Sequence, residues 1–141
     1  MFIFNNSEPK KFPQRKLKNI QNPMLTYLDL GKKGEEIARA HFLAQDYIIL
    51  HANWKLGRKE IDLIVRKGDC LVFVEVKTLA SDIWGFPEKN VTERKIRHIR
   101  AVANGYMDRM RELPKRIRFD IVAITFRRDG SHELVHFEDC F

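Results

Sequence analysis

The chain has 141 residues, of which 44% are hydrophobic, so it can bury the core of one domain. Charged residues make up 32%, and no apolar run approaches the roughly 18 to 20 residues that a membrane-spanning helix needs, which excludes a helical membrane protein. The net charge of +7 is compatible with polyanionic partners but identifies none of them.

The N-terminal part of the chain differs in composition from the rest. Residues 1–23 hold one acidic residue, three prolines and five basic residues, whereas the remainder holds 21 basic and 18 acidic residues. We therefore expect a basic, disordered arm over residues 1–23 and one domain over residues 24–141. Met24 follows the arm directly and is a second candidate for the start of translation.

Neither the N-terminus nor the cysteines indicate export. The apolar residues 1–4 are too few for the core of a signal peptide. Cys70 lies in an apolar stretch and Cys140 near the end of the chain, a pattern typical of neither a disulfide framework nor a zinc site. A reducing, cytoplasmic location is expected.

The first predicted elements are a helix and a strand. Hydrophobic periodicity predicts a helix over residues 31–45, with Ala38 and Phe42 on its buried face. Glu35 borders that face at helical spacing. Residues 47–54 then predict a strand.

Two strong strand patterns follow, over residues 60–65 and 71–77. Gly68 and Asp69 lie in the turn between them, so the two strands are expected to form a hairpin.

The second half of the chain predicts a helix and two further strands. Thr92 is a suitable N-cap for a helix that runs to about Leu113, where Pro114 ends it. Strands are predicted over residues 119–126 and 133–137. The order of one helix, three strands, one helix and two strands predicts an α/β domain with a mixed central sheet flanked by helices.

The hairpin carries a group of acidic residues at matching positions. If the turn pairs Lys67 with Cys70, Asp62 faces Glu75 on the opposite strand, and Glu60 faces Lys77. Directly opposite residues lie on one face, roughly 5 Å apart, and like charges in that arrangement are destabilising.

These carboxylates therefore require a compensating cation, and their oxygen ligands suit Mg²⁺ or Mn²⁺. Lys77 lies on the same face as Glu75, where it can stabilise developing negative charge. The alternative interpretation is an ordinary solvated hairpin face with cross-strand pairs such as Glu60–Lys77.

The pattern Asp62, then Glu75-Val76-Lys77, resembles the PD-(D/E)xK signature of restriction-endonuclease-like nucleases. Over residues 28–141 the chain is similar to the YraN-like bacterial family, which is related to Holliday-junction resolvases. The blocks that carry this resemblance are Gly31-Lys32-Lys33-Gly34-Glu35-Glu36-Ile37-Ala38, Asn53-Trp54, Glu60-Ile61-Asp62-Leu63-Ile64 and Phe73-Val74-Glu75-Val76-Lys77-Thr78, with Gly85, Pro87, Val91 and Lys95 after them.

The resemblance implies a restriction-endonuclease-like fold and roles for particular residues. Asp62, Glu75 and Glu35 would be metal ligands, Lys77 the catalytic lysine and Glu60 an accessory acid. The chain departs from the family pattern at Lys59, where the family usually has glycine, and after Thr78, where the usual arginine is replaced by Leu79-Ala80.

Basic residues near these acids are candidates for contacting phosphates. We select Lys95, Arg94, Arg97, Arg58 and Lys59; the alternative for the helix residues among them is a solvated face. Trp54 and Trp84 could stack on bases, although a core role is favoured for Trp54.

The leading hypothesis is a Mg²⁺- or Mn²⁺-dependent nuclease acting on nucleic acid, with DNA favoured and branched or otherwise structured sites as its substrate. The alternative is a nucleic-acid-binding module with little or no catalysis. A third interpretation is an adaptor that docks a protein partner through the basic helix. The sequence leaves open whether the chain forms a homodimer.

Overall fold

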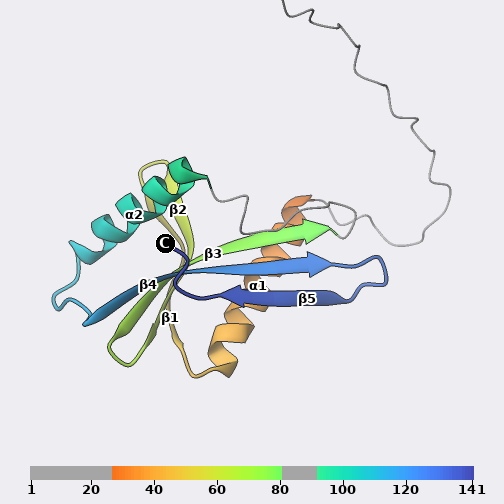
Figure 1. Ribbon diagram of the computed structural model, residues 1–141, viewed down its shortest axis with the longest axis horizontal. Helices are drawn as coiled ribbons and strands as arrows, with labels where there is room; N and C mark the ends of the chain where they lie inside the picture. Colours follow the sequence, from red (N-terminus) through yellow and green to blue (C-terminus); the bar gives the residue numbers. More distant parts are fainter. Residues whose placement is uncertain (1–26, 81–91) are drawn as a thin grey trace, which may run out of the picture.

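The computed structural model describes residues 27–80 and 92–141, so the expected arm over residues 1–23 and Trp84 lie outside the described part. The elements follow the predicted order (Figure 1). They are α1 (Tyr27–Ala44), β1 (Ile48–Leu56), β2 (Lys59–Lys67), β3 (Cys70–Ala80), α2 (Glu93–Met107), β4 (Arg116–Phe126) and β5 (His132–Phe137).

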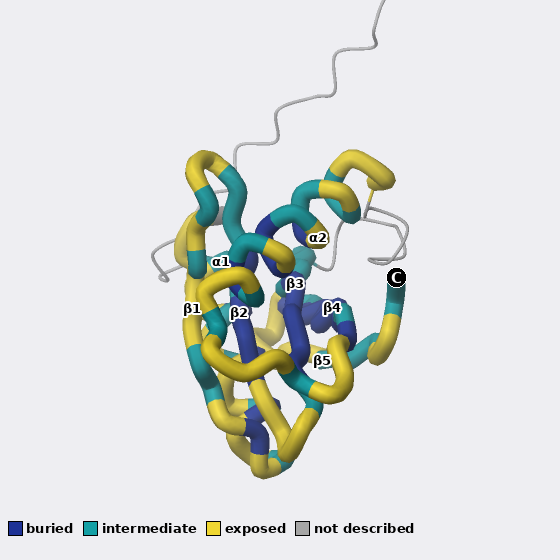
Figure 2. The backbone as a smooth tube through the Cα atoms, turned by 90° about the vertical axis from the view of Figure 1, so that its left-hand side faces the viewer, coloured by how far each residue is buried: buried dark blue, intermediate teal, exposed yellow. Residues whose placement is uncertain are grey.

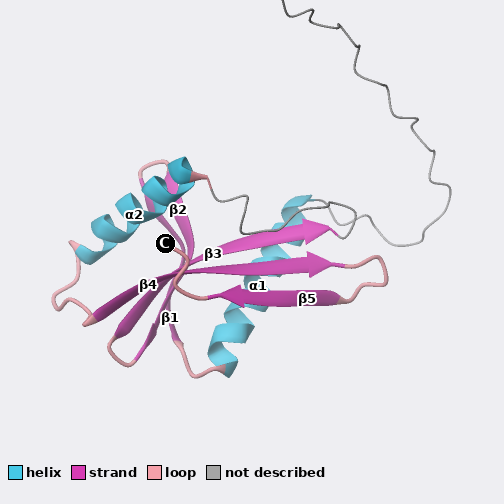
Figure 3. Ribbon diagram, viewed as in Figure 1, coloured by secondary structure: helices cyan, strands magenta, loops and turns pink. Residues whose placement is uncertain are grey.

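The five strands form one sheet in the order β1-β2-β3-β4-β5. Neighbouring strands are antiparallel except β3 and β4, which are parallel. A parallel pair needs a crossover connection, and α2 lies in this one. The mixed sheet with its two helices agrees with the expected restriction-endonuclease-like α/β fold (Figure 3).

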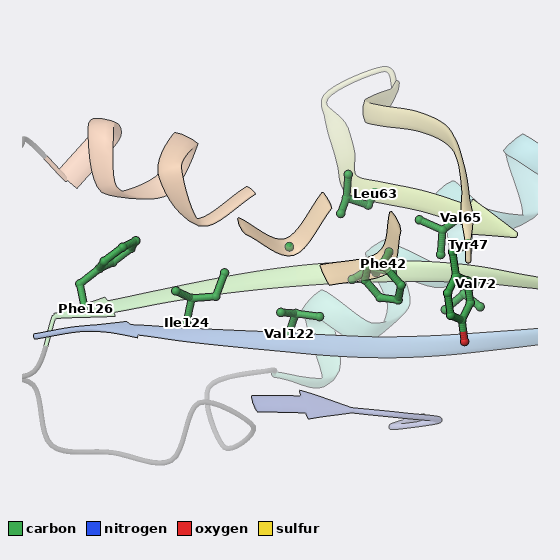
Figure 4. Packing of buried hydrophobic residues seen from close by; sticks show 10 residues of the cluster. Phe42, Tyr47, Leu63, Val65, Val72, Val122, Ile124 and Phe126 are labelled. Carbon is green, nitrogen blue, oxygen red and sulfur yellow. The ribbon is translucent and has the colours of Figure 1, made fainter. Parts of the chain in front are cut away.

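The apolar residues form two clusters, one with α1 and one with α2. Ala38 and Phe42 of α1 pack on alternate residues of β2, β3 and β4, and Figure 4 shows the β4 members of this cluster in a row pointing towards α1. Ile99 and Tyr106 of α2 belong to the second cluster, together with Phe73 of β3. The strands between the helices are buried along much of their length (Figure 2). Both faces of the sheet are therefore covered.

The prediction that α2 runs to about Leu113 is wrong, because the helix ends at Met107. Asp108 caps it, and its backbone N–H donates to the carbonyls of Asn104 and Tyr106. Asn104 and Gly105 are weak helix formers, so the last turn gains little from continuing. Leu113 is 70% exposed and does not extend the buried stripe.

The hairpin register is the predicted one from Lys67–Cys70 to Leu63–Val74. Beyond that point strict alternation fails. Ile61 packs in the α2 cluster together with Ile64, where alternation would place it with Leu63. The change of packing side therefore falls between Ile61 and Leu63, at the residue singled out as a site acid.

No helix in residues 27–80 or 92–141 combines the length and apolar character needed to cross a membrane.

Candidate active site

The candidate site lies where β2 and β3 separate. Their pairing extends from the turn to Leu63 and Val74, whereas β3 stays paired with β4 up to Ala80. In the gap, the Asp62 carboxylate takes over the role of a ladder partner, because its Oδ2 accepts a hydrogen bond of 2.6 Å from the backbone N–H of Val76. The side chain of Asp62 is thereby held towards β3.

Asp62 lies in an environment that opposes its ionisation. Burial raises the pKa of Asp62, and the negative charges of Glu75 and then Glu35 add to the effect, so that the pKa reaches about 7. The hydrogen bond from Val76 and the positive charge of Lys95 act in the opposite direction. The negative charge of Glu75 therefore acts on Asp62, and Glu35 contributes to the same field, although the ladder does not extend to the predicted direct pairing of Asp62 with Glu75.

Glu75 is the most buried acid of this group, with 4% of its surface exposed. Its Oε1 receives two ammonium groups, with Lys77 Nζ at 3.0 Å and Lys95 Nζ at 2.9 Å. Its Oε2 is buried and has no hydrogen-bond partner among the described residues. Oε1 of Glu75 thus contacts both lysine ammonium groups, whereas Oε2 is a buried acceptor without a donor among the described residues.

Lys95 reaches this site from the start of α2. Thr92 caps the helix as predicted, because its Oγ1 accepts a hydrogen bond of 3.3 Å from the backbone N–H of Lys95. The cap fixes Lys95 in the first turn, from which its long side chain extends to Glu75. We selected Lys95 as a phosphate contact; the structure brings it directly onto the acid pair.

Glu35 is held at the edge of the site by a residue that the sequence analysis did not assign a role. The amide Nδ2 of Asn53 on β1 donates a hydrogen bond of 2.9 Å to Glu35 Oε2. Asn53 adopts φ of 51°, a left-handed conformation that asparagine tolerates better than most residues. An asparagine within an apolar strand was the available sequence signal for this role.

A close helix–strand contact brings α1 near the end of β3. A Cβ at Gly34 would collide with Oγ1 of Thr78, so only glycine allows this approach. Glu35 is the next residue, and the contact therefore places it beside β3. This gives a physical reason for the glycine that precedes Glu35 in the motif.

The acids fit a divalent cation in part. Among residues 27–80 and 92–141, no three histidine, cysteine, aspartate or glutamate side chains are arranged to hold a metal ion. Asp62 and Glu75 are coupled, while the Glu35 carboxylate is engaged by Asn53. Mg²⁺ is commonly held by one or two carboxylates together with waters and substrate phosphates. The oxygen-only donor set and the unpartnered Oε2 of Glu75 suit such an ion.

The accessory position is arranged differently from the prediction. Glu60 was expected to face Lys77, but it lies opposite Lys55 of β1, and its carboxylate is 3.3 Å from the ammonium of Lys55. The predicted pairing is therefore wrong, because β2 leaves β3 at Asp62 while it remains paired with β1. Glu60 forms an exposed cross-strand ion pair.

Four of the five selected basic residues lie near His98 in the first half of α2. The pKa of His98 is lowered first by its partial desolvation and then by the positive charges of Lys59, Arg94, Lys95 and Arg97. Lys59 on β2 and the α2 residues therefore contribute to one electropositive region. Arg94 and Arg97 are exposed, and Arg97 makes a long ion pair of 3.8 Å with Glu93. Arg58 is exposed in the turn before β2.

A second polar cluster, which the sequence analysis did not anticipate, lies under the C-terminal half of α1. Asp120 is fully buried and accepts hydrogen bonds from Arg118, His136 and the backbone N–H of Asp139. Burial alone would raise the pKa of Asp120, but these donors lower it. Nδ1 of His136 lies 3.0 Å from Nε2 of His41 on α1. The cluster ties β4, β5 and α1 together.

Comparison with known proteins gives the family. The family model of the Uncharacterised protein family UPF0102 matches residues 34–124, which include both acids and both lysines of the site. A UPF0102 protein of Parabacteroides distasonis is 39% identical over 113 residues, 80% of this chain and 92% of the relative. One of Porphyromonas gingivalis is 38% identical over 119 residues, 84% of this chain and 87% of the relative. One of Nocardioides sp. is 37% identical over 107 residues, 76% and 86% of the two chains. The resemblance to the YraN-like family is confirmed, and the chain belongs to the UPF0102 family.

Proposed function

We propose that this protein is a metal-dependent nuclease that hydrolyses phosphodiester bonds in structured or branched DNA. The observation that carries the proposal is the coupled pair of Asp62 and Glu75, with two lysine ammonium groups on one oxygen of Glu75. A merely structural hairpin has no need of two adjacent acids at its buried end, because the arrangement opposes folding.

Asp62 and Glu75 would hold Mg²⁺ or Mn²⁺, with Glu35 as a further oxygen ligand. When bound, such an ion polarises a phosphoryl oxygen and lowers the pKa of a water molecule. The unpartnered Oε2 of Glu75 supplies a buried acceptor, and the N–H of Val76 orients the carboxylate of Asp62. Lys77 Nζ and Lys95 Nζ are positioned to donate to the negative charge that develops on the phosphate.

The electropositive region beside the acids suits the substrate's backbone. Lys59, Arg94 and Arg97 would contact phosphates without reading the sequence, because ammonium and guanidinium groups recognise charge rather than base edges. Each phosphate neutralised releases counterions, so binding should weaken steeply as salt increases.

The test is cleavage of a panel of labelled DNAs, comprising duplex, single-stranded, flapped and four-way forms, with Mg²⁺, Mn²⁺ or a chelator. We expect metal-dependent cleavage by the wild type and its loss in the Glu75→Ala and Lys77→Ala variants. Glu60→Ala is the matched acid control, because Glu60 forms its exposed ion pair with Lys55. Equal cleavage by the wild type and by the Glu75 and Lys77 variants would remove the assignment.

A nucleic-acid-binding module with little catalysis is the second candidate. It is favoured by one observation, namely that Lys77 and Lys95 already neutralise Glu75 without any metal. Such a module would bind DNA with the same affinity in Mg²⁺ and in chelator and would leave every DNA of the panel intact. Binding that persists in chelator together with metal-dependent cleavage would favour the nuclease.

A further inference from the structure

A small aromatic pocket lies between the edge strand β1 and the C-terminal half of α2. It has a volume of about 260 Å³ and is lined by His51, Trp54, Tyr106, Arg109 and Met110. Trp54, for which a core role was favoured, packs against the α2 cluster as expected and also lines this pocket. The volume is below the roughly 300 Å³ at which pockets for drug-sized ligands begin. It therefore suits one flat ring system.

The aromatic and basic residues that line the pocket suit a ligand with an aromatic ring and a negatively charged group. Tyr106 lies edge-on to Trp54 with ring centroids 5.2 Å apart, and His51 lies edge-on to Tyr106 at 5.4 Å. The guanidinium of Arg109 lies over the Trp54 ring, 5.1 Å from its centroid. Unpaired nucleobases stack both on aromatic rings and on arginine planes. Arg109 and His51 are exposed at the rim, where the cation can meet a phosphate.

The pocket is joined to the candidate active site through the fold. Trp54 pairs with Ile61, the residue before Asp62. The ring of Tyr106 lies 6.0 Å from that of Phe73, which precedes Glu75 by two residues on the same face of β3. Along α2, the eleven residue steps from Lys95 to Tyr106 span roughly 16 Å. A DNA strand that crosses the acids can therefore place a base a few nucleotides further along in the pocket.

We propose that this pocket binds an unpaired nucleobase a few nucleotides along the strand from the phosphate at the acid site, so that the protein selects DNA in which a base is free to leave the stack. An intact duplex would have to lose one stacked and paired base to fill the pocket, whereas a flap or junction supplies that base at lower cost. The inference deepens the proposed nuclease function, but occupancy of the pocket is measured without catalysis.

The experiment uses the Trp84→Phe protein in chelator, in which Trp54 is the one remaining tryptophan of the chain. Affinity is measured for two labelled DNAs with the same number of phosphates, an intact hairpin duplex and a hairpin with a shorter stem and a short single-stranded flap, and Trp54 fluorescence is followed in the same titrations. We expect tighter binding of the flapped DNA and quenching of Trp54 by it alone. Deoxyadenosine monophosphate is titrated as the free-nucleotide probe and should bind much more weakly.

The variants separate stacking from general charge. In the full chain, Trp54→Ala should reduce affinity for the flapped DNA by about 5- to 150-fold, the range for one stacked base, and leave affinity for the intact duplex unchanged. Arg109→Ala tests the rim without removing a core ring. Arg39→Ala is its charge-matched control, because Arg39 is also exposed but lies on α1, which does not line the pocket.

Three outcomes would overturn the inference: equal affinity for flap and duplex in the wild type, no quenching of Trp54 by the flap, or equal losses in the Arg109→Ala and Arg39→Ala variants. Binding of the free nucleotide as tight as that of the flap would also overturn it, since the pocket would then serve a mononucleotide. Cleavage is assayed separately. Flap-selective quenching without cleavage would support the base-binding pocket and contradict the nuclease function. Cleavage without flap selectivity would support the nuclease function and contradict the base-binding pocket.

Discussion

Lys95 of α2 lies 2.9 Å from Glu75 of β3, on the same carboxylate oxygen that Lys77 contacts at 3.0 Å. The lysines of the acid site therefore come from two elements, β3 and the crossover helix α2 that follows it. Lys77 comes from the hairpin itself, whereas Lys95 depends on the packing of α2. The arrangement makes the position of α2 a determinant of the site's electrostatics.

Lys95→Ala should impair cleavage without unfolding the protein, because Lys95 is partly exposed and Lys77 still neutralises Glu75. If Lys95 stabilises charge in the transition state, the cleavage rate should fall by about 10²–10³-fold, the usual effect of removing one such donor. Single-turnover cleavage measures it. Arg97→Ala, two residues further along α2 and exposed, is the control and should weaken binding at low salt with little effect on the rate. A Lys95→Ala rate equal to that of the wild type would limit Lys95 to DNA binding.

Asp62→Asn should stabilise the protein in chelator at neutral and alkaline pH. The pKa of Asp62 is raised from 3.8 to about 7, so its protonated form stabilises the fold below the unfolded value of 3.8 and this contribution is lost as the pH rises through 7. Asparagine retains an oxygen that can accept the N–H of Val76. Thermal melting should therefore show an advantage of the variant that grows between pH 4 and 7 and is constant above.

Divalent metal should reverse that difference. A cation that binds the folded carboxylates stabilises the wild type by mass action, whereas the Asp62→Asn variant has lost one ligand. Mn²⁺ titrated at pH 8 is expected to raise the melting temperature of the wild type several times more than that of the variant. An equal rise in both proteins would place the bound metal away from Asp62.

The sequence was sufficient to predict the order of elements and the register of the hairpin up to Leu63 and Val74, because alternating apolar residues and one tight turn determine both. It did not predict that the strands separate at Asp62. That separation depends on the competition between a ladder hydrogen bond and the Asp62 carboxylate for the N–H of Val76. Local sequence patterns do not indicate whether the N–H of Val76 donates to a backbone carbonyl of β2 or to the carboxylate of Asp62.

Long-range contacts account for the other differences. Lys95 was read as one cation on a basic helix, and its contact with Glu75 depends on where α2 packs. The apolar Leu113 suggested a longer helix, but Asn104 and Gly105 weaken its last turn and the chain must return to begin β4. Arg118, Asp120 and His136 were assigned no role from the sequence, because only the tertiary structure brings them together inside.

His98 should report on the electropositive region in solution. Partial desolvation and then four neighbouring cations lower its pKa from 6.5. Bound DNA phosphates would offset those cations, so the pKa should rise towards or above the ordinary value. The chemical shifts of the His98 ring protons, followed by NMR against pH with and without a short duplex, measure both states. The ring-proton shifts of His132, exposed on β5, should not change when DNA is added at constant pH and serve as the reference.

Asp120→Asn should be strongly destabilising, because Arg118 would remain buried with only the half-exposed Glu138, 3.4 Å away, as its counterion. Breaking a buried pair on one side typically costs about 3–5 kcal/mol. The lowered pKa of Asp120 means that its contribution is present above 3.8 and is lost as the pH falls through the lower folded value, so the wild type should also lose stability in acid. Urea unfolding measures both effects. Asp69→Asn, which removes an exposed partner of Lys115, should change stability by less than about 1 kcal/mol.

Gly34→Ala tests the close approach of α1 to β3. Alanine is favoured over glycine within a helix by about 1 kcal/mol, so propensity alone predicts a more stable protein. The new Cβ, however, would collide with Oγ1 of Thr78, and threonine has little rotamer freedom with which to move away. Overpacking of this kind typically costs about 1–3 kcal/mol. We therefore expect lower stability and, because Glu35 is the next residue, slower cleavage.

A double-mutant cycle identifies the contact responsible. Thr78→Ala removes the colliding oxygen and leaves the Thr78 Cβ position at 3.4 Å from the new methyl group, an ordinary contact. The Gly34→Ala/Thr78→Ala protein should therefore be more stable than Gly34→Ala alone, with a coupling energy of about 0.5–3 kcal/mol between the two positions. Gly31→Ala, at a helical glycine with open space around its Cβ, should stabilise the chain in either background. Additive effects at positions 34 and 78 would mean that α1 accommodates the methyl group by shifting, and Glu35 would then owe its position to Asn53 rather than to the contact with β3.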